Sequence, residues 1–487
     1  MSRINTNVSS MLAQRVLGNQ SRGLVTSLER LSTGLRINRG ADNPAGLIAS
    51  ENLRAEKAAI SAAIGNAQRA EQVVNVAEGG LQEINNLLLE LQSLIGESAN
   101  EAGVSAQEKE ANQLQIDSIL STIDRIANST SFNGTKLLNG NFDYTTTGVA
   151  ASLTNVDIQS AKLSDSGGAM AVTVQVTQSA QRGQVFFYTS SAIDNGGNGS
   201  ITIEVVGNKG SQQFTFAEGT TQANVIAAIN TFTEATGVRA STTASAVRVQ
   251  LRSTEFGANE FVRSQIVHGS SAGLMFEAAS GGAGTTSLTD HGRNATILIN
   301  GQQAITDGLS ARVSSDGLSL AVSIDGLSAL NNTNQSTTFN ITGGGANFNL
   351  SPKVSLAGKT TLGIGAVTTG NLGNGVVGVL SSVKAGGTAN VVNGDLSAAQ
   401  NIVDAAIKQV SGLRGRLGAF QKNTVAATMN NLGVALENTS AAESVIRDTD
   451  FAQETAMLTR QQILSQAATQ ALAIANAQPQ SVLALLG

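Results

Sequence analysis

The feature that most constrains this chain is a heptad spacing of aliphatic residues near both of its ends. Near the N-terminus, steps of three and four residues connect Leu24, Leu28, Leu31 and Leu35, and upstream Ile4, Val8 and Met11. Such steps place side chains on one face of an α-helix, and a sustained stripe favours packing against another helix. On spacing alone, an ordinary core stripe is the simpler explanation, and a seam between copies is the alternative.

A second, longer helix is predicted to follow. Asn43 and Pro44 form a start signal, because Asn caps helix N-termini and Pro suits the first helical position. The next Pro is residue 352, so one helix can extend from Pro44 to about residue 100. Its later part carries a stripe of Ala77, Leu81, Ile84, Leu88, Leu91 and Ile95. A further helix is predicted over about 106–126, with Ile116, Ile119, Ile123 and Ile126 on one face.

The last zone, from about residue 396, is also predicted to be helical. Its stripe consists of Val403, Ile407, Val410, Leu413, Leu417 and Phe420, and is extended by Leu432 and Leu436. After a polar patch at 448–450, a final helix is predicted to carry Met457, Ile463, Leu464 and Leu472. Pro479 is expected to interrupt this helix, because Pro cannot donate the backbone hydrogen bond that a helix interior needs.

The centre, about 140–395, has a different pattern. Val and Ile alternate with polar residues in VTVQV, ITIEV, VRVQL and ILING, and Gly, Ser, Thr and Asn are frequent. A period of two bounded by Gly or Asn turns is typical of β-strands. One compact unit is predicted, with strands at 201–206 and 212–216, a helix at 222–235, and strands at 238–242 and 246–252.

The two helical ends are predicted to pack on each other. An isolated amphipathic helix gains most of its stability from packing, so neither end can bury its stripe alone. Pairing them buries both stripes and leaves the centre as an insertion. The predicted fold class is therefore α+β: a long antiparallel helical bundle or coiled coil from the paired ends, with a β-rich central insertion of one or two small domains.

Composition excludes several classes of function. The net charge of −5 attracts neither nucleic acid nor an anionic membrane surface, and no apolar run is long enough for membrane insertion. The chain has no Cys, so disulfides and thiolate metal sites are impossible. His268 and His291 have no second ligand nearby and no HExxH motif, and the Gly tracts lack a phosphate-binding signature. No catalytic, metal or cofactor site is predicted, and the chain is not expected to be an enzyme.

Several segments at the two ends resemble the signatures of the flagellin family. SLERLSTGLRINRGADNPAGLIASENLRA (27–55) is similar to the N-terminal signature, and FNGTKLLNG (132–140) to the segment that closes the second conserved helix. LGAFQ (417–421), VIRDTDFAQE (445–454) and QILSQAATQALAIANAQPQSVLALL (462–486) resemble the C-terminal signature. The likeness covers about the first 140 and last 90 residues. The centre shows no such match and resembles only loosely the insertion modules of flagellins and hook-associated proteins.

This resemblance implies a structural subunit of the bacterial flagellar filament, which polymerises outside the cell into a helical tube for motility. It implies a homopolymer, with an export chaperone, the filament cap and hook-associated proteins as partners, and O-linked glycans on exposed Ser and Thr of the centre. It also implies export through the flagellar type III apparatus. No apolar signal-peptide core is recognised near Met1, so an export route that does not cleave such a signal is expected.

The resemblance also divides the chain into three regions. Residues 1–42 and 446–487 would form a terminal coiled-coil domain that orders on assembly. Residues 43–175 and 396–445 would form a helical bundle domain with a β-hairpin, and 176–395 the variable, β-rich outer part. The assembly seam would consist of Ile4, Val8, Met11, Leu24, Leu28, Leu31, Leu35, Ile463, Leu464, Leu472, Leu483 and Leu486.

One surface differs from the family pattern. In flagellins that the vertebrate innate receptor senses, the long helix carries an Arg in a contact stretch. The matching stretch here is LLELQSL (88–94), with Glu90 at that position, although Leu94 matches. Gln115 stands where the family often has Glu. A charge reversal at a contact Arg leaves an unfavourable pair, so weak or absent receptor activation is expected.

Two alternatives remain open from the sequence. A hook–filament junction protein shares both terminal regions with flagellins. A filament protein whose central insertion adds a surface adhesin role would have the same ends.

Overall fold

The structure is a computed structural model that describes residues 6–100, 103–163, 168–188, 192–193, 199–243, 248–269, 275–278, 284–375 and 377–486. The chain forms two compact units. Unit 1 consists of residues 1–71, 349–358 and 421–487, and unit 2 of residues 72–348 and 359–420. Among the helices that the structure describes, none combines the length and hydrophobicity that a membrane span requires.

The long helices begin and end close to the predicted positions. They are α1 (Val8–Thr33), α2 (Pro44–Ser98), α3 (Ala106–Ser129), α6 (Leu396–Ala419), α7 (Ala426–Arg447) and α8 (Phe451–Leu486). A capping box starts α3, because Ser105 and Glu108 bond each other's backbone N–H groups through their side chains. The expected interruption at Pro479 is wrong, since α8 continues through it. The loss of one backbone hydrogen bond does not end a helix whose flanking residues favour it.

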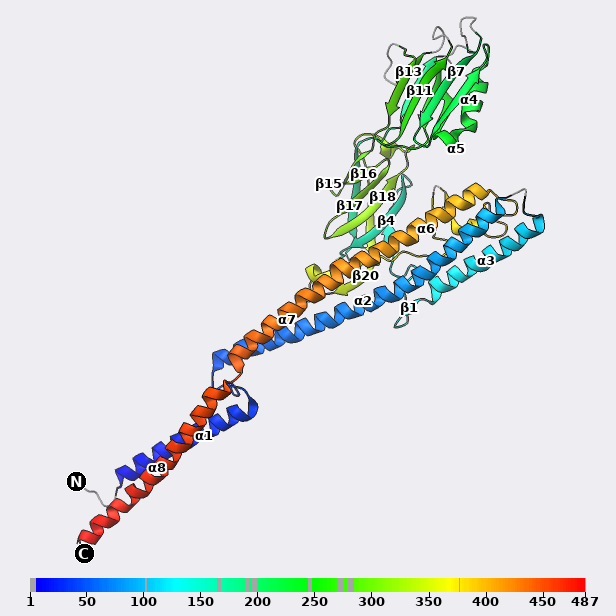
Figure 1. The fold of residues 1–487 in the computed structure, drawn as a ribbon. Coiled ribbons are helices and arrows are strands. Elements are labelled where there is room, and N and C mark those ends of the chain that lie inside the picture. The colour runs from blue at the N-terminus through cyan, green and yellow to red at the C-terminus, as the bar shows by residue number, and fades with distance from the viewer. Residues whose placement is uncertain are drawn as a thin grey trace. The chain divides into compact units, whose positions relative to one another are not determined.

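Unit 1 contains two helix pairs. The N-terminal part of α2 packs against α7 through Ile60, Ala63 and Leu432. Helices α1 and α8 run side by side over most of their length (Figure 1). Both pairs join residues from opposite ends of the sequence, as predicted.

Unit 2 contains the strongest apolar seam of the helical zones. The predicted stripe of α2, from Ala77 to Ile95, is fully or almost fully buried at all six positions. Facing residues come from α3, where Ile116 and Ile123 are buried, and from α6, where Val403 and Val410 are buried. The Gln92 side-chain amide donates to Asp404 Oδ1 at 2.7 Å and links α2 to α6. This part of the helical prediction is confirmed.

A π-helical turn, η4 (Phe420–Val425), lies between α6 and α7. Such a turn holds one more residue than an α-helical turn. The buried stripe of α6 reaches Phe420 in heptad steps, and the next buried residue is Val425, five positions later. The extra residue explains why Leu432 continues the buried stripe although it lies one position out of the heptad phase set by Leu417 and Phe420.

The centre contains two separate hydrophobic cores, each shared by two sheets. The first core lies in the sheets β15-β14-β5-β19-β3 and β16-β17-β18-β4, and the second in β12-β6-β10-β9 and β13-β11-β7-β8. The strands of the first core are β3 (Thr145–Thr147), β4 (Leu153–Ala161), β5 (Met170–Gln178), β14 (Thr296–Ile299), β15 (Gln302–Gln303), β16 (Ile305–Asp307), β17 (Ser310–Ser314), β18 (Leu318–Ile324) and β19 (Gln335–Gly343).

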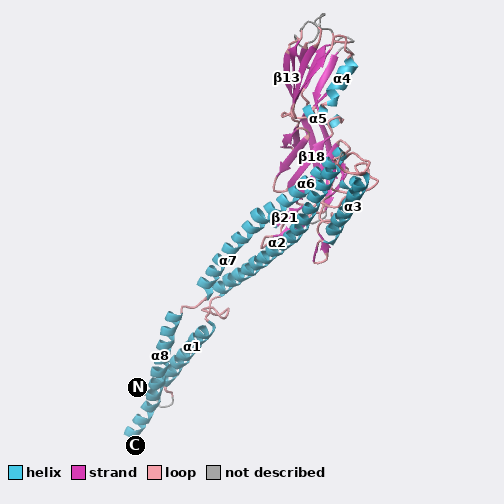
Figure 2. Cartoon of the chain, turned by 45° about the vertical axis from the view of Figure 1, so that its right-hand side comes forward, coloured by secondary structure: helices cyan, strands magenta, loops and turns pink. Residues whose placement is uncertain are grey.

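The strands of the second core confirm the compact unit predicted from 201 to 252. They are β6 (Gln184–Tyr188), β7 (Ile201–Gly207), β8 (Ser211–Phe216), β9 (Val238–Thr242), β10 (Arg248–Ser253), β11 (Phe261–His268), β12 (Phe276–Ala278) and β13 (Ser287–His291). The predicted helix between β8 and β9 is split into α4 (Gln222–Thr231) and α5 (Thr233–Thr236). Figure 2 shows the strands of the centre and the helices of the two ends in different colours.

Short elements complete the chain. A hairpin follows α3, formed by β1 (Ser131–Phe132) and β2 (Thr135–Lys136), and its turn residues Asn133 and Gly134 both have positive φ, as a two-residue hairpin requires. The remaining strands are β20 (Ala346–Asn349), β21 (Lys359–Leu362), β22 (Gly373–Asn374) and β23 (Gly378–Val379), and the 3-10 turns are η1 (Ala329–Asn331), η2 (Leu356–Gly358) and η3 (Leu380–Val383).

The buried stripe of α2 predicts a large difference between two neighbouring residues. Leu88 is 0% exposed and Leu89 is 49% exposed. We expect Leu88→Ala to lower the free energy of unfolding of unit 2 by about 2–5 kcal/mol, because it leaves a cavity, whereas Leu89→Ala changes it little. Urea denaturation of the unassembled protein measures both. Equal effects of the two substitutions would contradict the assigned face of α2.

Candidate assembly surface

The terminal helices α1 and α8 of unit 1 pair in antiparallel directions. The Ser10 hydroxyl donates to Asn476 Oδ1 at 2.7 Å near the start of α1. Near the end of α1, Arg30 forms an ion pair with Glu454 at 3.7 Å, and only 6% of the Glu454 side chain is exposed. The start of each helix therefore lies beside the end of the other, as both views show (Figure 2).

The seam between these two helices contains many small and polar side chains. Buried and half-buried residues step alternately by three and four in both helices, as in a coiled coil. The heptad consists of Ser10, Ala13, Leu17, Gln20, Leu24, Ser27 and Leu31 in α1, and of Glu454, Leu458, Gln461, Ser465, Ala468, Leu472 and Ala475 in α8. Leu holds five of these fourteen positions, and Ser, Gln, Glu and Ala hold the rest, so this seam is less apolar than the α2 stripe.

Large apolar side chains lie instead on the outside of the pair. Val8 is 66% exposed in α1, and Ile463 is 61% exposed in α8. We call the whole set the outward apolar stripe: Val8, Met11, Leu12, Val16, Val25, Leu28, Phe451, Met457, Ile463, Leu464 and Ile474. So many exposed large apolar side chains on one helix pair are typical of an interaction surface, because leaving them in water costs free energy.

The predicted seam residues divide between the two faces. Leu24, Leu31 and Leu472 are half-buried in the α1–α8 seam. Val8, Met11, Leu28, Ile463 and Leu464 belong to the outward apolar stripe. Leu35 follows α1 and is half-buried beside Asp448, with which it forms a β-bridge. Ile4 lies outside the described residues, and for Leu483 and Leu486 the structure describes the α8 backbone but not the side chains.

Some members of the outward apolar stripe were not predicted, namely Leu12, Val16, Val25, Phe451 and Ile474. Val8, Leu12 and Val16 step by four along α1, which places them on one face of the helix. This four-residue spacing could have indicated the outward face from the sequence, but the heptad of Ile4, Val8 and Met11 overlaps it and hides it.

The connections between the helix pairs are tied by backbone hydrogen bonds. Gly34 ends α1 in the left-handed conformation, with φ of 73°, and its carbonyl accepts from Thr449 N–H at 2.9 Å. The Arg36 N–H donates to the carbonyl of Arg447 at 2.7 Å. These bonds hold the segment after α1 against the segment between α7 and α8.

Asp42 organises the rest of the connection to α2. Its Oδ2 accepts from the backbone N–H groups of Asn38 and Arg39 at 3.0 and 2.8 Å. The bond from Arg39 is the main reason that the pKa of Asp42 lies below its ordinary value. The carboxylate therefore stays ionised and keeps this turn closed over the neutral range.

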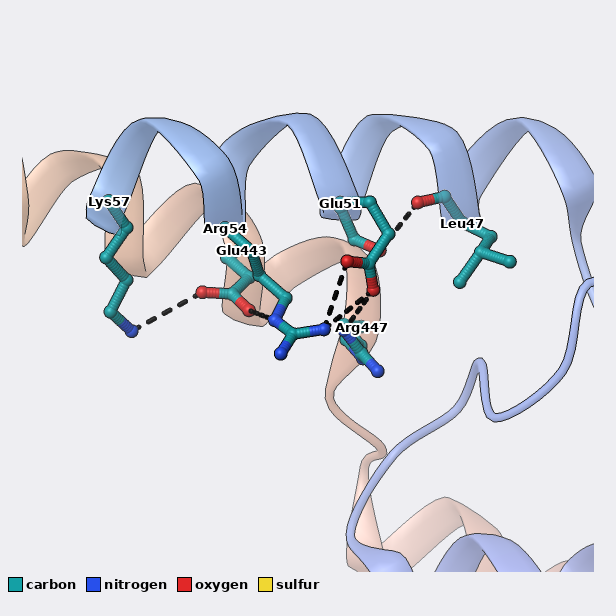
Figure 3. Close-up of polar contacts among 7 residues, drawn as sticks. Leu47, Glu51, Arg54, Lys57, Glu443 and Arg447 are labelled. Carbon is teal, nitrogen blue, oxygen red and sulfur yellow. Dashed lines mark hydrogen bonds and ion pairs between the residues drawn. The ribbon is translucent and has the colours of Figure 1, made fainter. Parts of the chain in front are cut away.

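A cluster of charges joins α2 to α7 in unit 1 (Figure 3). The Glu51 carboxylate accepts from Arg54 at 2.8 Å and from Arg447 at 3.0 Å. Glu443 lies 3.9 Å from Arg54 and 3.4 Å from Lys57. The hydrogen bond from Arg54 is the first cause that lowers the pKa of Glu51 from its ordinary 4.5.

The residues assigned to the receptor face lie in unit 2. Glu90 on α2 and Gln115 on α3 are exposed, whereas Leu94 is buried against the bundle. The two polar residues are therefore available to a partner, and the leucine is part of the core.

The two histidines lie on strands of the second core. The His291 ring is 5.7 Å from that of Phe261, the residue opposite it on β11, and His268 ends the same strand. In the described ranges, no group of three or more His, Asp or Glu side chains is arranged to hold a metal ion.

Comparisons with known proteins match most of the chain. The bacterial flagellin N-terminal helical region matches residues 4–143, and the bacterial flagellin C-terminal helical region matches residues 400–486. The flagellin hook IN motif matches residues 200–255. This last match lies in the centre and agrees with the loose resemblance of the centre to the insertion modules of flagellins and hook-associated proteins.

Individual relatives align along almost the whole length. Flagellin C of Vibrio cholerae is 31% identical, covering 99% of both chains. Flagellin A of Helicobacter pylori is 28% identical, also covering 99% of both chains. Among solved structures, FliC from Burkholderia pseudomallei is 15% identical over 72% of this chain and 98% of that chain, with a TM-score of 0.22.

The cluster in Figure 3 predicts a pH-dependent contribution to stability. Because the pKa of Glu51 is lowered in the folded state, its contribution is present above the ordinary pKa of 4.5 and is lost as the pH falls through the lowered value. We expect Glu51→Gln to lower the thermal midpoint at neutral pH and to make no difference in acid. Glu56→Gln, an exposed site on the same helix, is the control, and an equal neutral-pH effect there would contradict this assignment.

Proposed function

The chain belongs to the bacterial flagellin family and is a structural subunit of the extracellular flagellar filament, not an enzyme, and we propose that its copies join mainly through α1 and α8. Self-assembly into a filament is the property of the family. The proposal concerns which surfaces of this chain perform it. The observation that supports it is the outward apolar stripe.

The distribution of apolar side chains favours assembly through this pair. The seam within one chain mixes Leu with small and polar residues, while further Leu and all the large Ile, Val, Met and Phe side chains of the outward apolar stripe face outward. Fully burying one such side chain is worth about 1.5–3 kcal/mol. Several of them buried between neighbouring copies would exceed what the α1–α8 seam provides by itself, so the pair would be most stable within the polymer.

We also propose the three-part division of labour expected from the sequence. Residues 1–42 with 446–487 would order on assembly, 43–175 with 396–445 would form the folded bundle, and 176–395 would be the outer part. The breaks between α1 and α2 and between α7 and α8 support the first boundary, because they separate the pair with the outward apolar stripe from the rest of unit 1.

Further partners follow from the family. We propose an export chaperone for the unassembled chain, and the filament cap and hook-associated proteins as neighbours in the flagellum. O-linked glycans would attach to exposed hydroxyls of the centre, of which Ser310 and Ser314 on β17 are examples.

Substitutions in the outward apolar stripe test the assembly proposal. We expect the pair Leu12→Ser and Ile463→Ser to abolish seeded polymerisation, because each removes apolar area that copies would bury. Leu114→Ser is the matched control, since Leu114 is 68% exposed on α3, outside the terminal helices. Electron microscopy after seeding gives the result. Normal filaments from the double variant, or failure of the control alone, would refute the proposal.

The receptor face gives a separate prediction. We expect the wild-type protein to activate the vertebrate innate receptor weakly, and Glu90→Arg to increase activation in a reporter-cell assay, because it restores the charge found in sensed relatives. Glu97→Arg makes the same change at another exposed position of α2 and should have no effect. Full potency of the wild-type protein would show that Glu90 does not weaken recognition.

A further inference from the structure

A groove of about 870 Å³ opens beside the second core of the centre. One wall is α4, with Ala223, Ile226 and Asn230. The other is the sheet β6-β10-β9, together with the chain that enters β6. Helix α4 lies along one side of the strands of the second core (Figure 1).

Three arginines line this groove. Arg239 on β9 and Arg252 on β10 are direct partners in the antiparallel register, and Gln184 on β6 is the partner of Arg252 on its other side. Arg182 precedes Gln184 by two residues. Like charges directly opposite each other on a sheet are destabilising, so this arrangement costs stability in the protein alone.

Among the described residues, no ion pair neutralises these charges. Within the ranges that the structure covers, neither Arg239 nor Arg252 makes an ion pair or a side-chain hydrogen bond with another residue. Arg182 Nε is buried and has no hydrogen-bond partner, and the guanidinium lies 4.4 Å from the centre of the Phe256 ring. Burial is the largest cause that lowers the pKa of Arg182, and the positive charge of Arg252 lowers it further. The negative charge of Glu255 acts in the opposite direction and raises this pKa. An anion in the groove would supply the missing partner.

We propose that this groove binds an acidic polysaccharide, a chain of sugars that carries carboxylate or sulfate groups. Guanidinium groups match both anions in geometry and can bind them through paired hydrogen bonds. Ser241 and Thr242 line the same groove and offer hydroxyl groups that can bond to sugar hydroxyls. The volume of about 870 Å³ leaves room for more than one sugar ring.

Nucleic acid fits the groove less well. Single strands are held by stacking of bases on free aromatic rings. The ring of Phe256 is covered by Arg182, and a Cβ on Gly326 would lie only 2.5 Å from it, so no base could stack there.

This binding would gain strength from the polymer. Each subunit contributes one groove, so a filament presents many copies of a weak site along its length. Linked sites raise the effective concentration of the ligand and increase avidity without any new contact. The inference does not depend on which helices join the copies, because the groove lies within one chain.

Titration calorimetry of the full-length, unassembled protein tests the inference. The probes are a heparin tetrasaccharide, which carries sulfates and carboxylates, tetragalacturonic acid, which carries carboxylates alone, and neutral maltotetraose. We expect at least one acidic probe to bind, with affinity that falls as salt is added, and maltotetraose not to bind. Binding of the heparin probe alone identifies sulfate as the ligand group, and binding of both identifies carboxylate as sufficient.

Two variants and a matched control make the result specific. Arg252→Gln and Arg239→Gln should each weaken binding by about tenfold or more, since each removes a charge-assisted contact. The same substitutions should leave the thermal midpoint unchanged or raise it, because they relieve like-charge repulsion, which excludes misfolding as the cause. Arg263 is an exposed residue of β11 in the other sheet, and Arg263→Gln should leave binding unchanged.

Three results would overturn the inference. One is the absence of binding by both acidic probes at low salt. Another is an equal loss of binding in Arg263→Gln, which would show a general charge effect. The third is binding of a thymidine oligonucleotide at least as tight as that of either sugar and equally sensitive to Arg252→Gln, which would assign the groove to nucleic acid.

Discussion

Antiparallel pairing of the two chain ends is the constraint on which the rest of the structure depends. Helix α1 pairs with α8, and α2 packs against α7 in unit 1 and α6 in unit 2. Because residues near position 10 meet residues near position 476, the sequence between them must leave the helical region and return to it. A β-rich segment of any size can do this, provided that its own cores are closed, as the two cores of the centre are.

The two ends of the helical region differ in where they place apolar side chains. The α2 stripe in unit 2 packs Leu and Ile inward and is complete within one chain. The α1–α8 pair has a seam in which Leu alternates with Ser, Gln, Glu and Ala, and it leaves further large apolar residues exposed on its outer surface. Heptad spacing therefore serves a closed core in one place and an open surface in the other, and the difference lies in the share of large apolar residues that the seam buries.

The sequence predicted the helices, the inner stripe of α2 and the strands from 201 to 252, because each depends on a local period. It did not separate the two faces of α1, where Leu24 faces α8 and Leu28 faces outward, since adjacent stripes overlap in one heptad. The arginine groove could not be found either, because Arg182, Arg239 and Arg252 meet only through strand register. The turn η4 did have a signal in the sequence, because Leu432 lies twelve residues after Phe420. Alternating steps of three and four residues that start from Leu417 reach position 431, and not position 432.

The turn η4 has a consequence for how this chain can change over time. A regular helix turns by about 100° per residue, so a single insertion or deletion in α7 rotates every later side chain away from its partner. The wide turn of η4 already holds one residue more than an α-helical turn, at the point where the heptad repeat of α6 and α7 changes phase. The helical segment on either side of η4 can therefore gain or lose one residue, provided that η4 gains or loses its wide turn at the same time. Elsewhere in these helices, only the insertion or deletion of a whole heptad preserves the buried stripe.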